Sequence, residues 1–133
     1  MIGLDTNVLV RYIMQDDLKQ SPLANRLIES LTAESPGFVT MVSVVELGWV
    51  LSSAYELGRL ELIDAIEALL HAKELVVERA ETVWKAVRQF KAANADFADC
   101  LIACSAATAG CGRTMTFDRA AAKSSGMTLV ADR

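Results

Sequence analysis

Histidine, cysteine and proline are scarce in this chain of 133 residues. One histidine, together with three cysteines that lack zinc-ligand spacing, argues against a zinc site. Cys100, Cys104 and Cys111 form neither an even disulfide set nor a CxxC pair, so reduced thiols are expected. Only two prolines accompany 53% apolar and 23% charged residues, which is typical of a compact globular chain and excludes a disordered one.

Long hydrophobic runs are absent as well. The most apolar stretch, Phe38 to Leu51, is interrupted by Ser43 and Glu46 and is too short to cross a bilayer. The first five residues include Asp5 and no basic residue, so they make a poor secretory signal. We therefore expect a cytoplasmic protein without membrane contact, and the length predicts a single domain over residues 1–133.

Acidic residues outnumber basic ones by 17 to 13, and the net charge of −4 argues against a protein that coats duplex nucleic acid without specificity. A nuclease remains compatible with this charge. If four of the acids surround a metal ion, the rest of the surface is close to neutral.

Short apolar runs alternate with segments of helical periodicity along the chain. The predicted strands are Met1–Leu4, Phe38–Thr40, Leu75–Val77, Arg113–Phe117 and Met127–Ala131. Helices are predicted around Val8–Ile13, Ser21–Leu31, Ser43–Leu51, Leu62–Leu70, Val83–Phe90, Asp96–Ala109 and Asp118–Lys123. Because crossover helices cover parallel sheets, this order predicts an α/β sandwich with a mostly parallel sheet.

Acidic residues recur where the strands end. Asp5 and Asp118 directly follow strands, Glu46 lies one turn into a helix after another, and Asp96 and Asp99 open a helix. Functional groups in open α/β sheets gather beyond the carboxyl ends of the strands. Two like charges about 4 Å apart repel by roughly 4 kcal/mol at an effective dielectric of 20, so such a cluster favours a cation. Mg²⁺ or Mn²⁺ is the expected ion, because both prefer carboxylate oxygens.

Each acid also has a purely structural explanation. Asp5 and Asp96 are suitable N-caps, and Ser43 with Glu46 matches a capping box. Capping does not explain why all these acids fall at one sheet edge, so the joint pattern favours a site. Neighbouring hydroxyl and amide groups are candidates for holding the carboxylates in place: Thr6, Asn7, Ser43 and Thr116. Arg11 and Arg119 are candidates for phosphate contact.

Four motifs in this order resemble those of PIN-domain ribonucleases, and most closely VapC-type toxins of toxin–antitoxin systems. They are Asp5-Thr6-Asn7, Val44-Val45-Glu46-Leu47, Asp96-Phe97-Ala98-Asp99-Cys100-Leu101-Ile102-Ala103 and Thr116-Phe117-Asp118. The resemblance covers essentially the whole chain. It implies a three-layer α/β/α sandwich with a five-stranded parallel sheet, Mg²⁺- or Mn²⁺-dependent endoribonuclease activity on RNA, homodimerisation and inhibition by a cognate antitoxin.

The resemblance also implies the roles of the acids. The family's acidic ligands fall on Asp5, Glu46, Asp99 and Asp118, while Asp96 is a further metal-binding candidate that acts through water. Asp5, Asp99 and Asp118 are then metal ligands, and Glu46 orients a water molecule or acts as a base. No catalytic position is broken.

Other classes predict different residues. A receiver-like phosphorylation domain would carry an adjacent acidic pair after its first strand, and a haloacid-dehalogenase-like phosphatase would carry D-x-D; Asp5-Thr6-Asn7 is neither. The remaining alternative is a non-catalytic binding module whose acidic pocket holds a basic partner segment.

The helix around Val42 to Leu51 is apolar on nearly every side, so we expect it to be fully buried. Because a sheet covers only one helix face in a small domain, its outer side is predicted to form an antitoxin groove or part of a homodimer interface.

Overall fold

The computed structural model describes residues 1–131. It divides the chain into two compact units, an N-terminal unit of residues Met1–Ala80 and a C-terminal unit that begins at Glu81. The expectation of a single domain remains a prediction.

The N-terminal unit combines a parallel sheet with four helices. Its elements are β1 (Ile2–Gly3), α1 (Thr6–Met14), α2 (Gln20–Glu29), β2 (Gly37–Val39), α3 (Met41–Ser53), α4 (Arg59–His71) and β3 (Leu75–Val77). The strand order is β1-β2-β3, with Gly37 of β2 opposite both Ile2 and Leu75. Asp5 therefore lies just beyond the carboxyl end of β1, the edge at which functional groups gather in such sheets.

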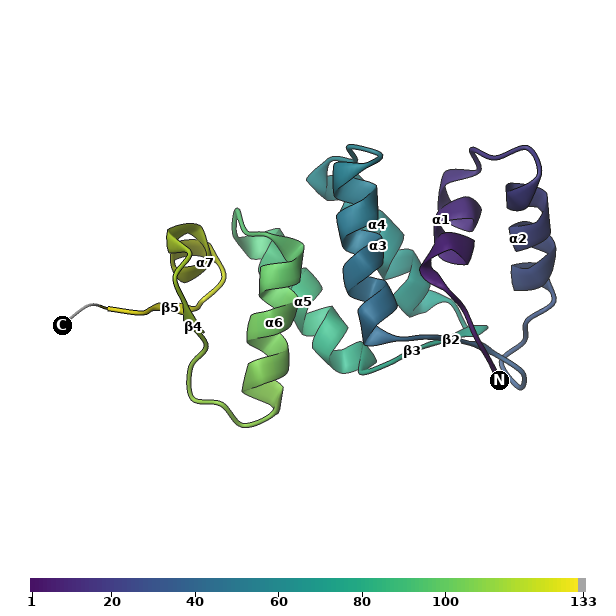
Figure 1. Cartoon of the computed structure of the whole chain (residues 1–133). Coiled ribbons are helices and arrows are strands. Elements are labelled where there is room, and N and C mark those ends of the chain that lie inside the picture. Colours follow the sequence, from purple (N-terminus) through teal and green to yellow (C-terminus); the bar gives the residue numbers. More distant parts are fainter. Residues whose placement is uncertain (132–133) are drawn as a thin grey trace. The chain divides into compact units, whose positions relative to one another are not determined.

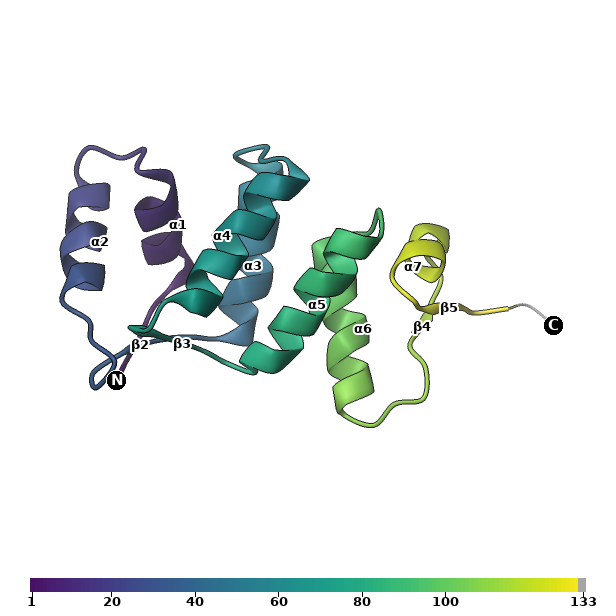
Figure 2. The ribbon, with the colours of Figure 1, turned by 180° about the vertical axis from the view of Figure 1, so that it is seen from behind.

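Helix α1 packs between α2 and α3, while α4 contacts both α3 and β3. Figure 1 and the reverse view in Figure 2 show α1 and α2 side by side beyond the end of β1. Leu9 of α1 and Leu47 and Leu51 of α3 are completely buried, as is Val39 of β2. This apolar packing fixes the start of α1 and the middle of α3, which carry the acids of the unit.

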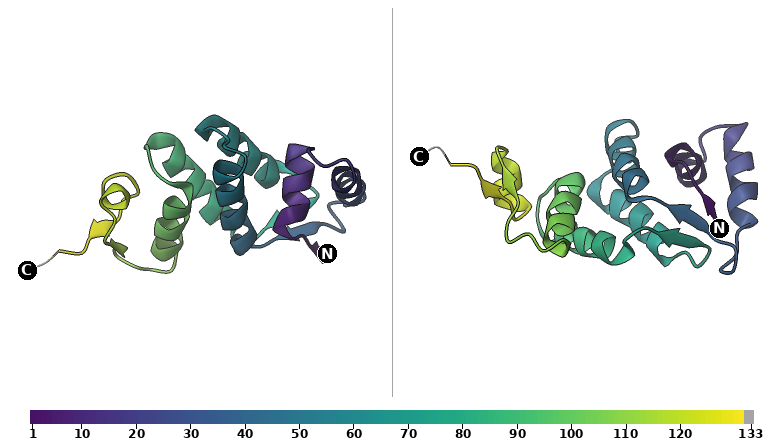
Figure 3. Two further views of the ribbon diagram at one scale, coloured as in Figure 1. Left: turned by 45° about the horizontal axis from the view of Figure 1, so that its top comes forward. Right: turned by 60° about the horizontal axis from the view of Figure 1, so that its bottom comes forward.

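The C-terminal unit is built from α5 (Ala80–Ala92), which begins at the last residue of the N-terminal unit, α6 (Phe97–Thr108), β4 (Met115–Thr116), α7 (Arg119–Ser124) and β5 (Thr128–Leu129). Strands β4 and β5 are parallel, and α7 connects them and packs against both; Figure 3 shows these three elements together in both views. Phe90 and Phe97 meet edge to face with ring centroids 5.6 Å apart. This contact holds the end of α5 against the start of α6, where Asp96 and Asp99 lie.

The predicted α/β class and the parallel strand pairing are confirmed. All five predicted strands are present within residues 1–131, but they pair as a three-stranded sheet and a two-stranded sheet. The three-stranded sheet belongs to the N-terminal unit and the two-stranded sheet to the C-terminal unit. A strand's sequence determines its tendency to extend, whereas its partner depends on which backbone lies beside it.

The predicted helix starts need two corrections. Helix α2 begins at Gln20, one residue before the predicted start at Ser21, because the Asp17 carboxylate accepts hydrogen bonds from the N–H groups of Lys19 and Gln20. Helix α3 begins at Met41, two residues before the expected Ser43, with Thr40 as its N-cap. The predicted capping box of Ser43 and Glu46 is absent, because both residues lie inside the helix.

Helix α3 is buried on one side and exposed on the other within the N-terminal unit. Val44, Leu47 and Leu51 are buried, but Val42 and Trp49 are 76% and 66% exposed. Its buried side faces α1 and α4, which cover only part of its circumference. The exposed side remains available for a partner.

Two further expectations can be compared with the structure. The three cysteines are reduced thiols, although only Cys100 is buried and Cys111 is exposed. None of the helices described for residues 1–131 is long and apolar enough to span a membrane.

Candidate active site

Asp5 lies at the turn between β1 and α1. It is the N-cap of α1, with extended backbone angles, and its Oδ1 accepts a hydrogen bond of 2.7 Å from the N–H of Thr6. The Thr6 hydroxyl is buried and has no partner among residues 1–131. Asp5 therefore has a structural role, yet its carboxylate remains exposed beside an unused hydroxyl.

A cavity of about 500 Å³ opens at this end of the N-terminal unit. Its lining residues come from the start of α1 and from α3 with the turn that follows: Asp5, Thr6, Asn7, Val10, Arg11, Glu46, Val50, Ala54 and Tyr55. The structure thus brings together Asp5 and Glu46, which are 41 positions apart in the sequence, with a guanidinium and a phenol. Carboxylate oxygens can bind a cation, and a guanidinium can bind an anion.

Glu46 is not used to cap α3. The Thr40 hydroxyl accepts a hydrogen bond from the N–H of Ser43 at 3.1 Å, and Glu78 accepts one from Met41 at 2.7 Å. These two groups satisfy the helix start, while the exposed Glu46 carboxylate makes no hydrogen bond within residues 1–131. Glu46 therefore does not form the capping box that was its structural explanation.

Asp96 and Asp99 open α6 in the C-terminal unit. Asp96 is the N-cap, and its Oδ1 accepts a hydrogen bond of 3.2 Å from the N–H of Asp99. Partial burial raises the pKa of the Asp99 carboxyl above its usual 3.8, and the negative charges of Asp96 and Asp118 raise it further. The three acids are thus near enough for their charges to interact.

Asp118 follows β4 and begins α7. Its Oδ1 accepts hydrogen bonds from the N–H groups of Ala120 at 2.8 Å and Ala121 at 3.2 Å, so it caps the helix. The Thr116 hydroxyl accepts a hydrogen bond from the N–H of Asp118 at 3.0 Å. Thr116 therefore fixes the backbone from which the Asp118 carboxylate projects.

The donor chemistry of these groups fits a hard divalent cation. All five predicted acids carry carboxylate oxygens, and a cation beside Asp99 would oppose the effects that raise its pKa. Asp5 and Glu46 belong to the N-terminal unit, and Asp96, Asp99 and Asp118 belong to the C-terminal one. Among the described residues of either unit, no three acids, histidines or cysteines lie close enough to hold an ion as a group.

The PIN domain family model matches residues 2–126, nearly the whole chain. The chain belongs to the PIN domain family. PIN domains are generally nucleases that need divalent metal ions, so the family agrees with the carboxylate donor set. Among curated proteins, none matches the chain.

Two polar residues beside the PIN-domain motifs were missed by sequence reasoning. Tyr55 lines the cavity of Asp5 and Glu46, and Asp16 accepts a hydrogen bond of 2.7 Å from its hydroxyl. No local motif marks Tyr55, whereas the adjacent acids Asp16 and Asp17 after α1 were a detectable signal. Of the two predicted phosphate contacts, Arg11 lines this cavity and Arg119 is exposed at the start of α7.

Proposed function

We propose that this PIN-domain protein is a Mg²⁺- or Mn²⁺-dependent endoribonuclease and the toxin of a toxin–antitoxin pair. The observation that carries the proposal is the cavity lined by Asp5 and by Glu46, a glutamate that does not cap α3. The PIN domain family model matches the chain over residues 2–126. The interacting carboxylates of Asp96, Asp99 and Asp118 support it independently.

The catalytic acids in this proposal are Asp5, Glu46, Asp99 and Asp118. Asp5, Asp99, Asp118 and Asp96 would hold the metal ion. When bound, Mg²⁺ or Mn²⁺ acidifies a water molecule and neutralises charge on the scissile phosphate. Carboxylates placed at helix starts suit this task because hydrogen bonds to backbone N–H groups hold them in one orientation.

Glu46 has a different role. Its carboxylate makes no hydrogen bond within residues 1–131 and is exposed to the cavity, so it can orient a water molecule and accept its proton. Thr6, Asn7, Ser43 and Thr116 support the acids, and the Thr116 bond to the Asp118 backbone is the contact of this kind with the clearest geometry. Arg119, next to Asp118, is available to a phosphate.

The toxin assignment rests on the resemblance of the four motifs to VapC-type proteins. The proposal therefore includes a cytoplasmic location, inhibition by a cognate antitoxin and a homodimer. The exposed side of α3 supports a partner surface, because Val42, Val45 and Trp49 lie at helical spacing and are exposed. A second copy of the chain or an amphipathic antitoxin helix would bury it.

The test is cleavage of a labelled single-stranded RNA by purified protein with Mg²⁺, with Mn²⁺ and with a chelator. Endonucleolytic products that require either ion, and that disappear in Asp5→Asn but persist in Asp64→Asn, support the proposal. Asp64 is a matched control because it is an exposed aspartate on α4 outside the cavity. Metal-independent or absent cleavage, with retained capture of a basic peptide, would instead favour the non-catalytic binding module.

A further inference from the structure

Arg11 of α1 lies at the junction of two cavities in the N-terminal unit. One is the cavity that contains Asp5 and Glu46, and the other is a cavity of about 260 Å³ between α1 and α2. Arg11 and Asn7 line both. An RNA strand that occupies the first cavity and continues toward α2 must therefore pass the Arg11 guanidinium.

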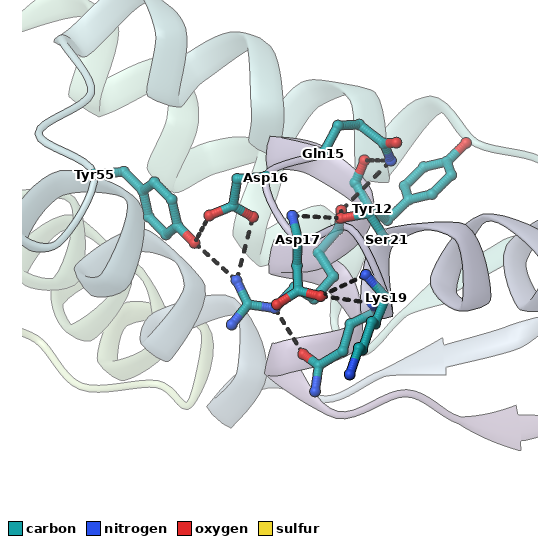
Figure 4. Close-up of polar contacts among 9 residues, drawn as sticks. Tyr12, Gln15, Asp16, Asp17, Lys19, Ser21 and Tyr55 are labelled. Atoms are coloured by element: carbon teal, nitrogen blue, oxygen red, sulfur yellow. Dashed lines mark hydrogen bonds and ion pairs between the residues drawn. The ribbon is translucent and has the colours of Figure 1, made fainter.

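The side chain of Arg11 is held by three groups. Its Nε donates to Gln20 Oε1 at 2.8 Å, and its Nη1 donates to Asp16 Oδ1 at 3.2 Å and to the Tyr55 hydroxyl at 3.1 Å. The Tyr55 hydroxyl in turn donates to Asp16 Oδ2 at 2.7 Å. Figure 4 shows Tyr55 and Asp16 pointing toward one another and linked by this bond. We call Asp16, Gln20 and Tyr55 the Arg11 clamp.

The backbone at Arg11 is fixed as well. Its carbonyl accepts hydrogen bonds from the buried Ser21 hydroxyl at 2.9 Å and from the N–H of Gln15 at 3.1 Å. An arginine anchored at both ends loses little rotational freedom when it binds a ligand.

The clamp leaves one nitrogen unused. Three of the five guanidinium N–H donors bind the clamp, and no hydrogen bond within residues 1–131 uses Nη2. The Arg11 side chain is 30% exposed. The Asp16 carboxylate accepts one hydrogen bond on each oxygen, from Arg11 Nη1 and from the Tyr55 hydroxyl. The two N–H groups of Arg11 Nη2 therefore remain for an incoming anion.

We propose that Arg11 binds a backbone phosphate of the RNA through Nη2, and that Tyr55 and Asp16 are positioning residues that set the direction of its guanidinium. The ligand class rests on the proposed ribonuclease function. The phosphate lies next to the cavity of Asp5 and Glu46, so Arg11 holds the strand beside the cleavage site without taking part in bond breaking. The alternative is that the hydrogen bonds of Tyr55 to Arg11 and Asp16 only connect α1 to the turn after α3.

The first experiment measures RNA affinity without cleavage. A labelled single-stranded RNA is titrated with protein in a chelator over a series of NaCl concentrations, and binding is followed by fluorescence anisotropy. Losing one phosphate contact flattens the slope of log Kd against log[NaCl] by about 0.7. We expect this change in Arg11→Gln and no change in Arg26→Gln, which removes an exposed charge on α2 outside both cavities.

Two conservative variants separate positioning from structure. Arg11→Lys keeps the charge and should keep the slope while binding more weakly, and it also serves if Arg11→Gln does not fold. Tyr55→Phe removes only the hydroxyl and should raise KM for RNA cleavage several-fold with kcat unchanged. A purely structural role would lower Tm in these variants without moving the salt slope or KM.

An unchanged slope in Arg11→Gln, an equal change in Arg26→Gln, or no measurable RNA binding by the wild-type protein at low salt would overturn the inference. Failure of the nuclease proposal has a different signature. Wild-type protein that cleaves no RNA with either metal, yet shows the Arg11-dependent slope, refutes the nuclease and retains the Arg11 contact.

Discussion

Asp99 is a residue whose negative charge is expected to lower stability and to support catalysis. Its pKa is raised by partial burial and by the charges of Asp96 and Asp118, so ionised Asp99 destabilises the folded protein when no metal is bound. Asp99→Asn removes this charge. We expect RNA cleavage to fall by on the order of 100-fold or more, while Tm in a chelator stays equal or rises.

The pH dependence of that Tm difference follows from the sign of the shift. A group whose folded-state pKa is raised contributes stability that is complete below its unfolded value, near 3.8 for Asp99, and is lost as pH rises through the folded value. Asp99→Asn should therefore exceed the wild type in Tm at neutral pH, and the difference should vanish as pH falls toward 3.8. Thermal scans across this range, with Asp64→Asn as control, check it.

Asp96 offers a comparison one helical turn away. Its carboxylate caps α6, and asparagine is a comparable cap, so Asp96→Asn should leave Tm nearly unchanged. Because it is proposed to act through water, its loss of cleavage should be smaller than that of Asp99→Asn. The reverse order of activities would show that Asp96 is the direct ligand.

At the scale of the element, α7 tests whether capping alone explains Asp118. Asparagine can accept the same hydrogen bonds from Ala120 and Ala121, whereas alanine cannot. Asp118→Asn should keep Tm but lose cleavage, and Asp118→Ala should lose both, with a stability cost of about 1 kcal/mol. Chemical denaturation gives the stability difference, and full activity in Asp118→Asn would leave Asp118 with a capping role only.

For the whole molecule, metal binding should appear as stabilisation. An ion that binds only the folded state adds about 2.7 kcal/mol at a concentration 100 times its Kd, which corresponds to a Tm rise of roughly 5–10 °C. We expect Mg²⁺ or Mn²⁺ to produce a rise of this kind that shrinks in Asp118→Asn. An unchanged Tm across millimolar concentrations of both ions would contradict metal binding by the free protein.

The exposed side of α3 predicts association at the same scale. Aromatic residues dominate interface energies, so Trp49→Ser should weaken self-association or antitoxin binding by at least about 10-fold. Leu60→Ser is the matched control, since Leu60 is 77% exposed on α4. Light scattering and antitoxin titration provide the measurement. A monomeric wild type whose antitoxin binding is insensitive to Trp49→Ser would refute the proposed interface.

The sequence by itself determined the elements, their order and the acids that begin helices. The strand before Asp5, the strand before Asp118 and the start of α6 at Asp96 were all predictable. These features depend on residues a few positions apart, because apolar periodicity and N-capping act over one helical turn or one short strand. For the same reason the PIN-domain motifs are recognisable in the linear sequence.

Only the tertiary structure decided which groups share hydrogen bonds and cavities. Glu78 displaces the expected capping box although it is 37 residues from Met41, and Tyr55 reaches Asp16 across 39 residues. The pairing of the strands as sets of three and two, and the exposure of Trp49, depend likewise on packing between distant segments. A polar side chain bonds to whichever partner the fold places within about 3 Å, and that partner is not encoded in neighbouring residues.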